Sequence, residues 1–147
     1  MQSNEIFKKA VTIQATPSEV WDTLTNPVLM KKWMFETDIE IITDWKTGSP
    51  IIIRGDLHGM DFVNNGTVLA FEEGKRLQYN HLNSLSKLSD DPENYSIIEF
   101  ILSPIENQTV LTLTLSNFPT EEIYRHLAFY WNVTLEILKK QIELSRL

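Results

Sequence analysis

The stretch 120-TEEIYRHLAFYWNVTLEILKKQIELSRL-147 decides the fold. Thr120 is a good N-cap, and the two glutamates after it suit the positive end of a helix, so the pattern predicts one long helix over 120–147. At 100° per residue, one apolar stripe comprises Ala128, Trp131, Leu135, Leu138 and Ile142. A second stripe beside it comprises Tyr130, Val133, Ile137 and Leu144. Together they span roughly 200°, wider than the ~100° needed to pack on one layer. We therefore expect this helix to be gripped by more than one surface.

The chain before this helix is rich in strand patterns. Period-two apolar residues predict a first strand within 5–15 and six more at 38–45, 50–57, 61–73, 76–83, 95–103 and 108–118. Turn residues such as Lys46-Thr47-Gly48-Ser49 and His58-Gly59 separate them, which is typical of an antiparallel meander. Residues 84–94 form a long polar connection, which we expect to be a solvated loop.

Two short helices are predicted between the first and second strands, in 15-ATPSEVWDTLTNPVLMKKWM-34. Thr16 caps the first helix and Glu19 completes a capping box, while Asn26-Pro27 repeats the signal for a second helix that runs to about Met34. These residues, which include Trp21 and Trp33, carry more apolar surface than two short helices can bury against each other. These helices therefore either plug a larger core or wall a cavity.

The order of elements predicts an α+β fold and one domain over residues 1–147. We expect a helix-grip arrangement, in which a curved seven-stranded antiparallel sheet wraps around the long C-terminal helix. The two short helices would close one end of the groove.

Composition narrows the classes of partner. With 20 acidic against 13 basic residues, the net charge of −7 repels polyanions, so we expect no nucleic-acid partner. No run of about 18 apolar residues and no signal-peptide pattern is present, so we expect a cytoplasmic protein without integral membrane association. The absence of cysteine excludes disulfides and cysteine-based metal sites.

Several motifs, in this order, resemble one protein superfamily. They are Thr16-Pro17-Ser18-Glu19-Val20-Trp21 with Lys32-Trp33, Gly66-Thr67-Val68-Leu69, Arg76-Leu77-Gln78-Tyr79, Thr109-Val110-Leu111-Thr112-Leu113, Phe118-Pro119, and Trp131 with Leu135-Glu136-Ile137-Leu138. The sequence is similar to the START-like (SRPBCC, Bet v 1-like) superfamily, in its branch related to the C-terminal domain of the activator of Hsp90 ATPase. The resemblance implies a helix-grip fold in a group that includes lipid carriers, hormone-binding proteins, cyclases, aromatases and a co-chaperone.

Two positions depart from the pattern of this branch. Tyr130 stands where a small residue commonly precedes the tryptophan of the long helix, which would narrow any cavity. Gly48-Ser49 replaces a glycine pair common at the start of the third strand.

Polar candidates are few. His81 follows Leu77 and Tyr79 in period two, so we expect all three to point from one strand into the groove, and His126 lies on the long helix near Tyr130. Glu99 has the opposite parity to Ile98 and should face solvent, whereas an inward Arg54 would be a counter-ion for an acidic ligand. We predict no catalytic residues, metal site or cofactor, because the three histidines are scattered and the five glycines form no nucleotide fingerprint.

These patterns lead to three functional hypotheses. We favour a non-enzymatic protein that encloses a small hydrophobic or lipid-like ligand between the long helix and the sheet. The cavity-lining candidates are Trp33, Phe35, Phe62, Phe71, Tyr79, His81, Phe118, Tyr130 and Trp131. One alternative is a protein-interaction module with a filled core and a chaperone partner. Another is a cyclase- or aromatase-like enzyme that uses a buried ionisable group such as His81 or Arg54.

Overall fold

The computed structural model describes residues 4–145, and their strands form one antiparallel sheet. The strands are β1 (Phe7–Ile13), β2 (Ile39–Thr43), β3 (Pro50–Leu57), β4 (Met60–Glu72), β5 (Arg76–Asn83), β6 (Ser96–Ile105) and β7 (Gln108–Ser116). They lie in the order β1-β7-β6-β5-β4-β3-β2, and each neighbouring pair is antiparallel. The predicted seven-stranded sheet is confirmed.

The helices also follow the predicted order. α1 (Pro17–Thr25) and α2 (Pro27–Met30) lie between β1 and β2, and α3 (Glu121–Leu144) follows β7. The capping box of α1 forms as predicted, since the Glu19 amide donates to Thr16 Oγ1 at 3.2 Å and the Thr16 amide donates to Glu19 Oε1 at 3.1 Å. α2 ends at Met30 rather than near Met34, because turns follow that carry Trp33 into the core.

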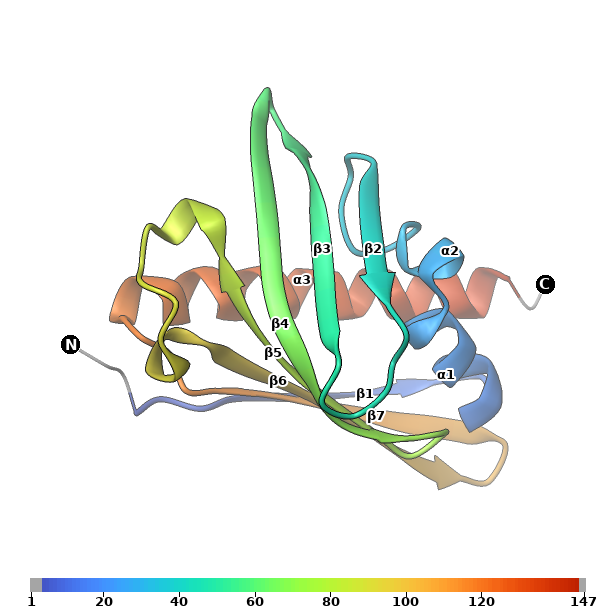
Figure 1. Ribbon diagram of the computed structural model, residues 1–147. Helices are drawn as coiled ribbons and strands as arrows, with labels where there is room; N and C mark the ends of the chain where they lie inside the picture. Colours follow the sequence, from blue (N-terminus) through green and yellow to red (C-terminus); the bar gives the residue numbers. More distant parts are fainter. Residues whose placement is uncertain (1–3, 146–147) are drawn as a thin grey trace.

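The sheet bends strongly, so that β2, β3 and β4 cross one side of α3 while β1, β6 and β7 pass beneath it (Figure 1). Gly66 lies where β4 passes very close to the backbone of β5. A Cβ atom there would lie 1.7 Å from the Asn80 carbonyl oxygen, so only glycine permits this approach. The Thr67 amide donates to Asn80 Oδ1 at 2.7 Å, and the pairing of β4 with β5 shifts register between Val68 and Ala70. This irregularity accompanies the bend.

α3 is buried along one stripe, which corrects the expectation of two. Its buried residues are Leu127, Trp131, Thr134, Leu135, Leu138 and Ile142. Of the second predicted stripe only Tyr130 packs against the core. The remaining apolar residues of that side are exposed, and we call them the outer stripe: Phe129 (74% exposed), Val133 (44%), Ile137 (43%) and Leu144 (63%). The prediction was wrong because apolar periodicity does not show which apolar residues find a neighbour.

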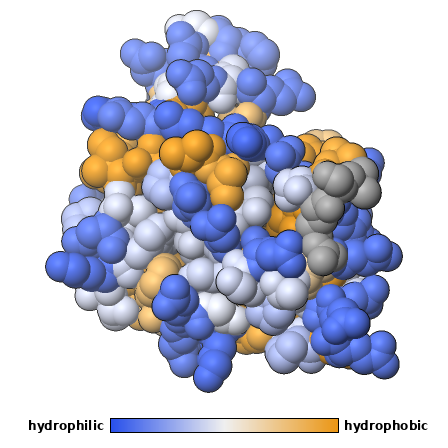
Figure 2. Space-filling view, turned by 90° about the vertical axis from the view of Figure 1, so that its right-hand side faces the viewer, coloured by the Kyte–Doolittle hydropathy of each residue, from blue (hydrophilic) through white to orange (hydrophobic). Residues whose placement is uncertain are grey.

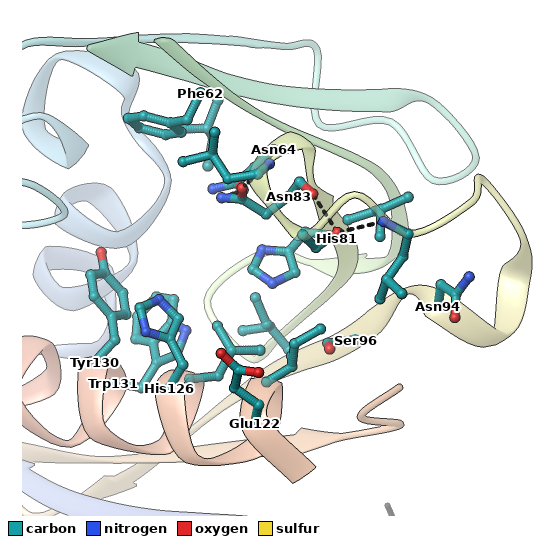
Figure 3. A pocket seen from close by; sticks show the side chains of 18 of the residues that line it. Phe62, Asn64, His81, Asn83, Asn94, Ser96, Glu122, His126, Tyr130 and Trp131 are labelled. Atoms are coloured by element: carbon teal, nitrogen blue, oxygen red, sulfur yellow. Dashed lines mark hydrogen bonds between the residues drawn. The ribbon is translucent and has the colours of Figure 1, made fainter. Parts of the chain in front are cut away.

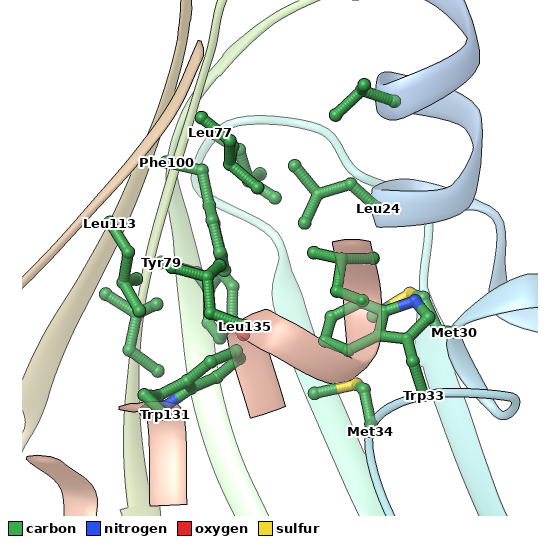
Figure 4. Close-up of a cluster of buried hydrophobic side chains, with 14 of the residues drawn as sticks. Leu24, Met30, Trp33, Met34, Leu77, Tyr79, Phe100, Leu113, Trp131 and Leu135 are labelled. Atoms are coloured by element: carbon green, nitrogen blue, oxygen red, sulfur yellow. The ribbon is translucent and has the colours of Figure 1, made fainter. Parts of the chain in front are cut away.

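The short helices plug the core. Leu24, Met30 and Trp33 point toward Leu77 and Phe100 of the sheet and toward Trp131 and Leu135 of α3 (Figure 4). Trp33 is buried, and its indole Nε1 donates to the Thr23 carbonyl at 2.9 Å. The apolar bulk of residues 15–34 is therefore covered by the sheet and α3 rather than by the two helices alone.

The outer face of the sheet is polar where the sequence predicted it. Glu99 accepts from Arg76 Nε at 2.9 Å and from Gln78 Nε2 at 3.2 Å, on the face opposite Ile98 and Phe100.

At the end of the molecule where α1, α2 and the last turns of α3 lie, the surface is mainly hydrophilic with separate apolar patches (Figure 2).

Candidate ligand-binding cavity

A cavity of about 480 Å³ lies between α3 and the concave face of the sheet (Figure 3). Strands β3 to β6, the segment after β5, the turn after α2 and the first turns of α3 supply its wall. The predicted residues that line it are Phe35, Phe62, Tyr79, His81, Tyr130 and Trp131.

One side of the cavity is an aromatic wall, formed by Phe35, Phe62, Tyr130 and Trp131. Adjacent rings in this series have centroids 5.2 Å apart for Phe62 and Phe35, 5.5 Å for Phe35 and Tyr130, and 5.2 Å for Tyr130 and Trp131. The Tyr130 hydroxyl donates to the Met34 carbonyl oxygen, which joins α3 to the turn after α2. Burial raises the pKa of the Tyr130 hydroxyl, so it stays neutral at physiological pH.

The other side is a polar patch, formed by Asn64, His81, Asn83 and Ser96, and lies to the right of the aromatic side chains in Figure 3. It consists of two cross-strand pairs, Asn64 with Asn83 and His81 with Ser96. Asn83 Nδ2 donates to Asn64 Oδ1 at 2.7 Å, and Asn83 Oδ1 accepts from the Leu85 amide at 2.7 Å. The first pair is thus satisfied internally.

The second pair is not. Within residues 4–145, neither the His81 imidazole nor the Ser96 hydroxyl makes a hydrogen bond to another protein group. Burial, together with a smaller contribution from the nearby His126, lowers the pKa of His81 to about 4. His81 therefore presents a neutral imidazole, with one donor and one acceptor nitrogen, to the cavity.

Residues 84–94 correct a prediction. Rather than only a solvated loop, this segment contains two single 3-10 turns, η1 (Ser84–Ser86) and η2 (Pro92–Asn94), and contributes Leu85, Ser86, Leu88 and Asn94 to the cavity wall. Its polar composition hid this role. The two leucines, three positions apart in a polar segment, were the available signal.

The opening of the cavity is marked by lining residues that are exposed, which are Leu57, Leu85, Glu122 and His126. They belong to the end of β3, to η1 and to the first turns of α3. A ligand would therefore enter between the β3–β4 hairpin, η1 and the N-terminal end of α3.

The remaining predicted residues lie elsewhere in the core. Trp33 packs beside Trp131 with ring centroids 6.2 Å apart, Phe71 packs between Trp21 and Trp45, and Phe118 packs on Tyr124. These three aromatic residues support the fold around the cavity rather than line it.

Arg54 does not point inward. It is exposed, and its Nε donates to Glu40 Oε1 on the neighbouring strand β2. The sequence left its direction open, and alternation along β3 turns Ile51 and Ile53 inward and Arg54 outward, so Arg54 is not a counter-ion inside the groove.

The sequence analysis missed three residues of the polar patch, Asn64, Asn83 and Ser96. Asn64 stands two positions after Phe62, and Ser96 two positions before Ile98, so strand parity alone would place each beside an inward apolar residue. Within the described residues, no group of three or more His, Asp or Glu side chains is placed to hold a metal ion, and no helix is long and apolar enough to cross a membrane.

Comparison with protein families gives a match over residues 14–143 to the family described as Activator of Hsp90 ATPase homolog 1-like protein. The chain belongs to this family. Its helix-grip fold and the predicted resemblance are thereby confirmed. A comparison with curated proteins found no match.

Solved structures of similar proteins agree with this assignment. The solution structure of ChR145 from Cytophaga hutchinsonii is 34% identical, with a TM-score of 0.82, and the match covers 99% of this chain and 98% of that one. The solution structure of an Aha1 dimer from Colwellia psychrerythraea is 25% identical, with a TM-score of 0.73, and the match covers 95% and 96%. Protein MLL2253 from Mesorhizobium loti, at 24% identity and a TM-score of 0.79, shares the fold over 97% of this chain and 100% of its own. Family and fold together support a module for ligand binding or protein interaction.

Proposed function

We propose that the protein binds a small, largely apolar ligand in the cavity between α3 and the sheet, without catalysing a reaction on it. The observation that carries this proposal is the cavity itself. Its volume of about 480 Å³ lies within the range of roughly 300–1,000 Å³ typical of small-molecule sites, and its aromatic wall supplies the apolar surface such sites use.

Burial of the ligand would drive the binding. Each Å² of apolar ligand surface removed from water contributes roughly 25 cal/mol. The rings of Phe35, Phe62 and Tyr130 meet at centroid distances of 5.2 and 5.5 Å, so they form a continuous surface against which a flat or extended apolar molecule can pack.

The experiment uses N-phenylnaphthylamine, a neutral apolar molecule whose fluorescence rises in apolar surroundings. We expect saturable binding by the purified protein and a higher melting temperature with the probe. A ligand at a hundred times its dissociation constant stabilises a protein by about 2.7 kcal/mol. Native mass spectrometry would show a complex with one probe molecule.

A matched pair of variants locates the binding. Leu127 is buried and lines the cavity, so Leu127→Trp should fill it and abolish probe binding. Val133 is exposed on the same helix, so Val133→Trp should bind like the wild type. Equal probe binding by both variants, or no saturable binding by the wild type, contradicts the proposal.

A second candidate function is protein interaction, and the outer stripe of α3 favours it. Phe129, Val133 and Ile137 expose apolar surface along one side of a rigid helix, which is common at protein-binding sites. The similar protein from Colwellia psychrerythraea is described as a dimer, and the family name refers to a chaperone activator. The partner would therefore be a second copy of the chain or a chaperone.

This candidate is tested without reference to the cavity. Light scattering after size-exclusion chromatography measures self-association, and a pull-down with purified Hsp90 measures chaperone binding. We expect Phe129→Lys to abolish the interaction, while Arg125→Lys on the exposed side of the same helix should preserve it. A monomer that binds no Hsp90 removes this candidate and leaves the ligand-binding proposal intact.

A further inference from the structure

The polar patch gives the cavity a chemical preference beyond apolar burial. On β5 and β6, His81 and Ser96 are paired across the strands, and both side chains face the cavity. Ser96 is 2% exposed. Neither side chain is hydrogen-bonded to another protein group among residues 4–145, and neither contributes a fully buried unpaired atom, since Thr37 Oγ1 is the one such atom in these residues. Their polar atoms are therefore open to the cavity and available to a ligand group.

The charges around the cavity define what this group can be. No lysine or arginine is among the described residues that line it, and the one carboxylate is that of Glu122, exposed at the opening. A ligand carboxylate at His81 and Ser96 would be buried with no lysine or arginine beside it, and the exposed His126 would be the one basic side chain of the described lining residues outside the polar patch, which is unfavourable. The N-terminal end of α3 offers no compensation, because Thr120 caps it and Glu121 and Glu122 already occupy its first turn.

A cationic group is equally disfavoured. Glu122 is solvated at the opening, whereas the polar patch itself contains two amides, a hydroxyl and an imidazole. The burial that keeps the imidazole of His81 uncharged would also penalise an ammonium group beside it. A hydroxyl group has both a donor and an acceptor, which match the donor and acceptor nitrogens of a neutral imidazole and the hydroxyl of Ser96.

We propose that His81 and Ser96 select a neutral ligand that carries a hydroxyl group, such as a phenol or an alcohol, on an apolar body. This inference rests on the proposed function, since it assigns the polar end of the same ligand. The apolar body packs on the aromatic wall, and the hydroxyl group exchanges hydrogen bonds with the two side chains. His81 and Ser96 are specificity-determining residues under this assignment.

The test uses four molecules with the same apolar body. Biphenyl, para-phenylphenol, para-biphenylcarboxylate and para-phenylbenzylamine are each titrated at neutral pH against protein loaded with N-phenylnaphthylamine. We expect para-phenylphenol to displace the probe at the lowest concentration, about tenfold below biphenyl, which is the factor that about 1.4 kcal/mol of hydrogen bonding supplies. The carboxylate and the amine should be weaker than biphenyl.

Two variants assign the preference to the named residues. His81→Phe and Ser96→Ala should each reduce the preference for para-phenylphenol over biphenyl, while biphenyl itself still displaces the probe. Ser103→Ala is the matched control, because Ser103 is an exposed serine on the same strand β6. Near-ultraviolet circular dichroism establishes that each variant is folded. Ser96→Ala keeps the test decisive if the larger change at His81 prevents folding.

The outcomes separate the two proposals. If the probe binds but the carboxylate or the amine displaces it best, or if the preference for the phenol is absent or survives both variants, the polar assignment is wrong and the ligand-binding function stands. If the wild-type protein binds no probe, both proposals fail.

Discussion

The aromatic wall and the polar patch face the same cavity but differ in how their residues are held. They meet on β4, where Phe62 of the wall is followed two positions later, on the same face, by Asn64 of the patch. The rings of the aromatic wall contact one another, whereas the polar patch holds one satisfied pair and one pair without a partner. Packed aromatic rings stabilise the fold in the absence of a ligand. A polar group without a protein partner instead gains a hydrogen bond when a ligand binds to it.

This contrast predicts its largest effect at Trp131. The side chain is 2% exposed and packs on Trp33, Phe100 and Tyr130. Trp131→Ala should lower the free energy of unfolding by about 3–5 kcal/mol, because it leaves a cavity beside the existing one. Urea denaturation measures the change.

Phe129 provides the control, because it stands two positions away on the outer stripe. Phe129→Ala should change the free energy of unfolding by no more than about 0.5 kcal/mol. Similar losses of stability for the two variants would mean that the outer stripe is covered in solution. The two faces of α3 would then not differ in burial.

The second largest effect concerns pH and the polar patch. His81 has a pKa of about 4 in the folded protein against an ordinary value of 6.5, so between these values the unfolded chain binds a proton that the folded chain does not. The contribution of neutral His81 to stability is fully present above pH 6.5 and declines as the pH falls toward 4. The total decline should reach about 3 kcal/mol at most, as the pKa difference implies.

Denaturation curves for the wild type and His81→Phe, recorded at several values between pH 7 and 4, isolate this contribution. Other groups near the cavity, including His126, Glu122, Tyr79 and Tyr130, are common to both proteins and largely cancel in the difference. The variant should lose less stability than the wild type over this range. Parallel curves would show that His81 is solvated, and the polar patch would then lie open to water.

The fold and the two sides of the cavity were predictable from the sequence to different extents. Strand alternation, turn residues and the helix caps gave the order of elements, because each of these signals is local. Phe62 and Trp131 of the aromatic wall were predicted to line the cavity because a bulky aromatic residue is itself a local signal. Asn64, Asn83 and Ser96 did not stand out, because asparagine and serine within a strand are also typical of turns and solvated faces.

Pairing across strands was the information that the sequence lacked. The register shift between Val68 and Ala70 decides that Asn64 faces Asn83, and the close approach at Gly66 depends on the backbone of Asn80 on the neighbouring strand. The burial of α3 was mispredicted on similar grounds. Val133 and Ile137 are as apolar as its buried residues, but they remain 44% and 43% exposed.

The third prediction concerns the satisfied pair of the polar patch. Asn83→Ala removes the donor to Asn64, which is 7% exposed, and the acceptor of the Leu85 amide. It should destabilise the protein by about 1–3 kcal/mol, the usual effect of leaving a buried polar group unpaired. Asn65→Ala, at an exposed position next to Asn64, is the control and should be close to neutral. Hydrogen exchange at the Leu85 amide should accelerate in Asn83→Ala alone, since this bond holds η1 against the cavity.

The smallest effect should come from the hydrogen bond that joins the aromatic wall to the turn after α2. Tyr130→Phe keeps the ring but removes the hydroxyl that donates to the Met34 carbonyl, so stability should fall by about 1 kcal/mol. Because this bond joins α3 to the turn that carries Phe35, its loss should loosen the wall more than it weakens the fold. The dissociation rate of N-phenylnaphthylamine should therefore rise in Tyr130→Phe, as stopped-flow fluorescence can measure. An unchanged rate together with a loss of several kcal/mol would instead make Tyr130 part of the structural core, and the wall could no longer be separated from the packing that supports it.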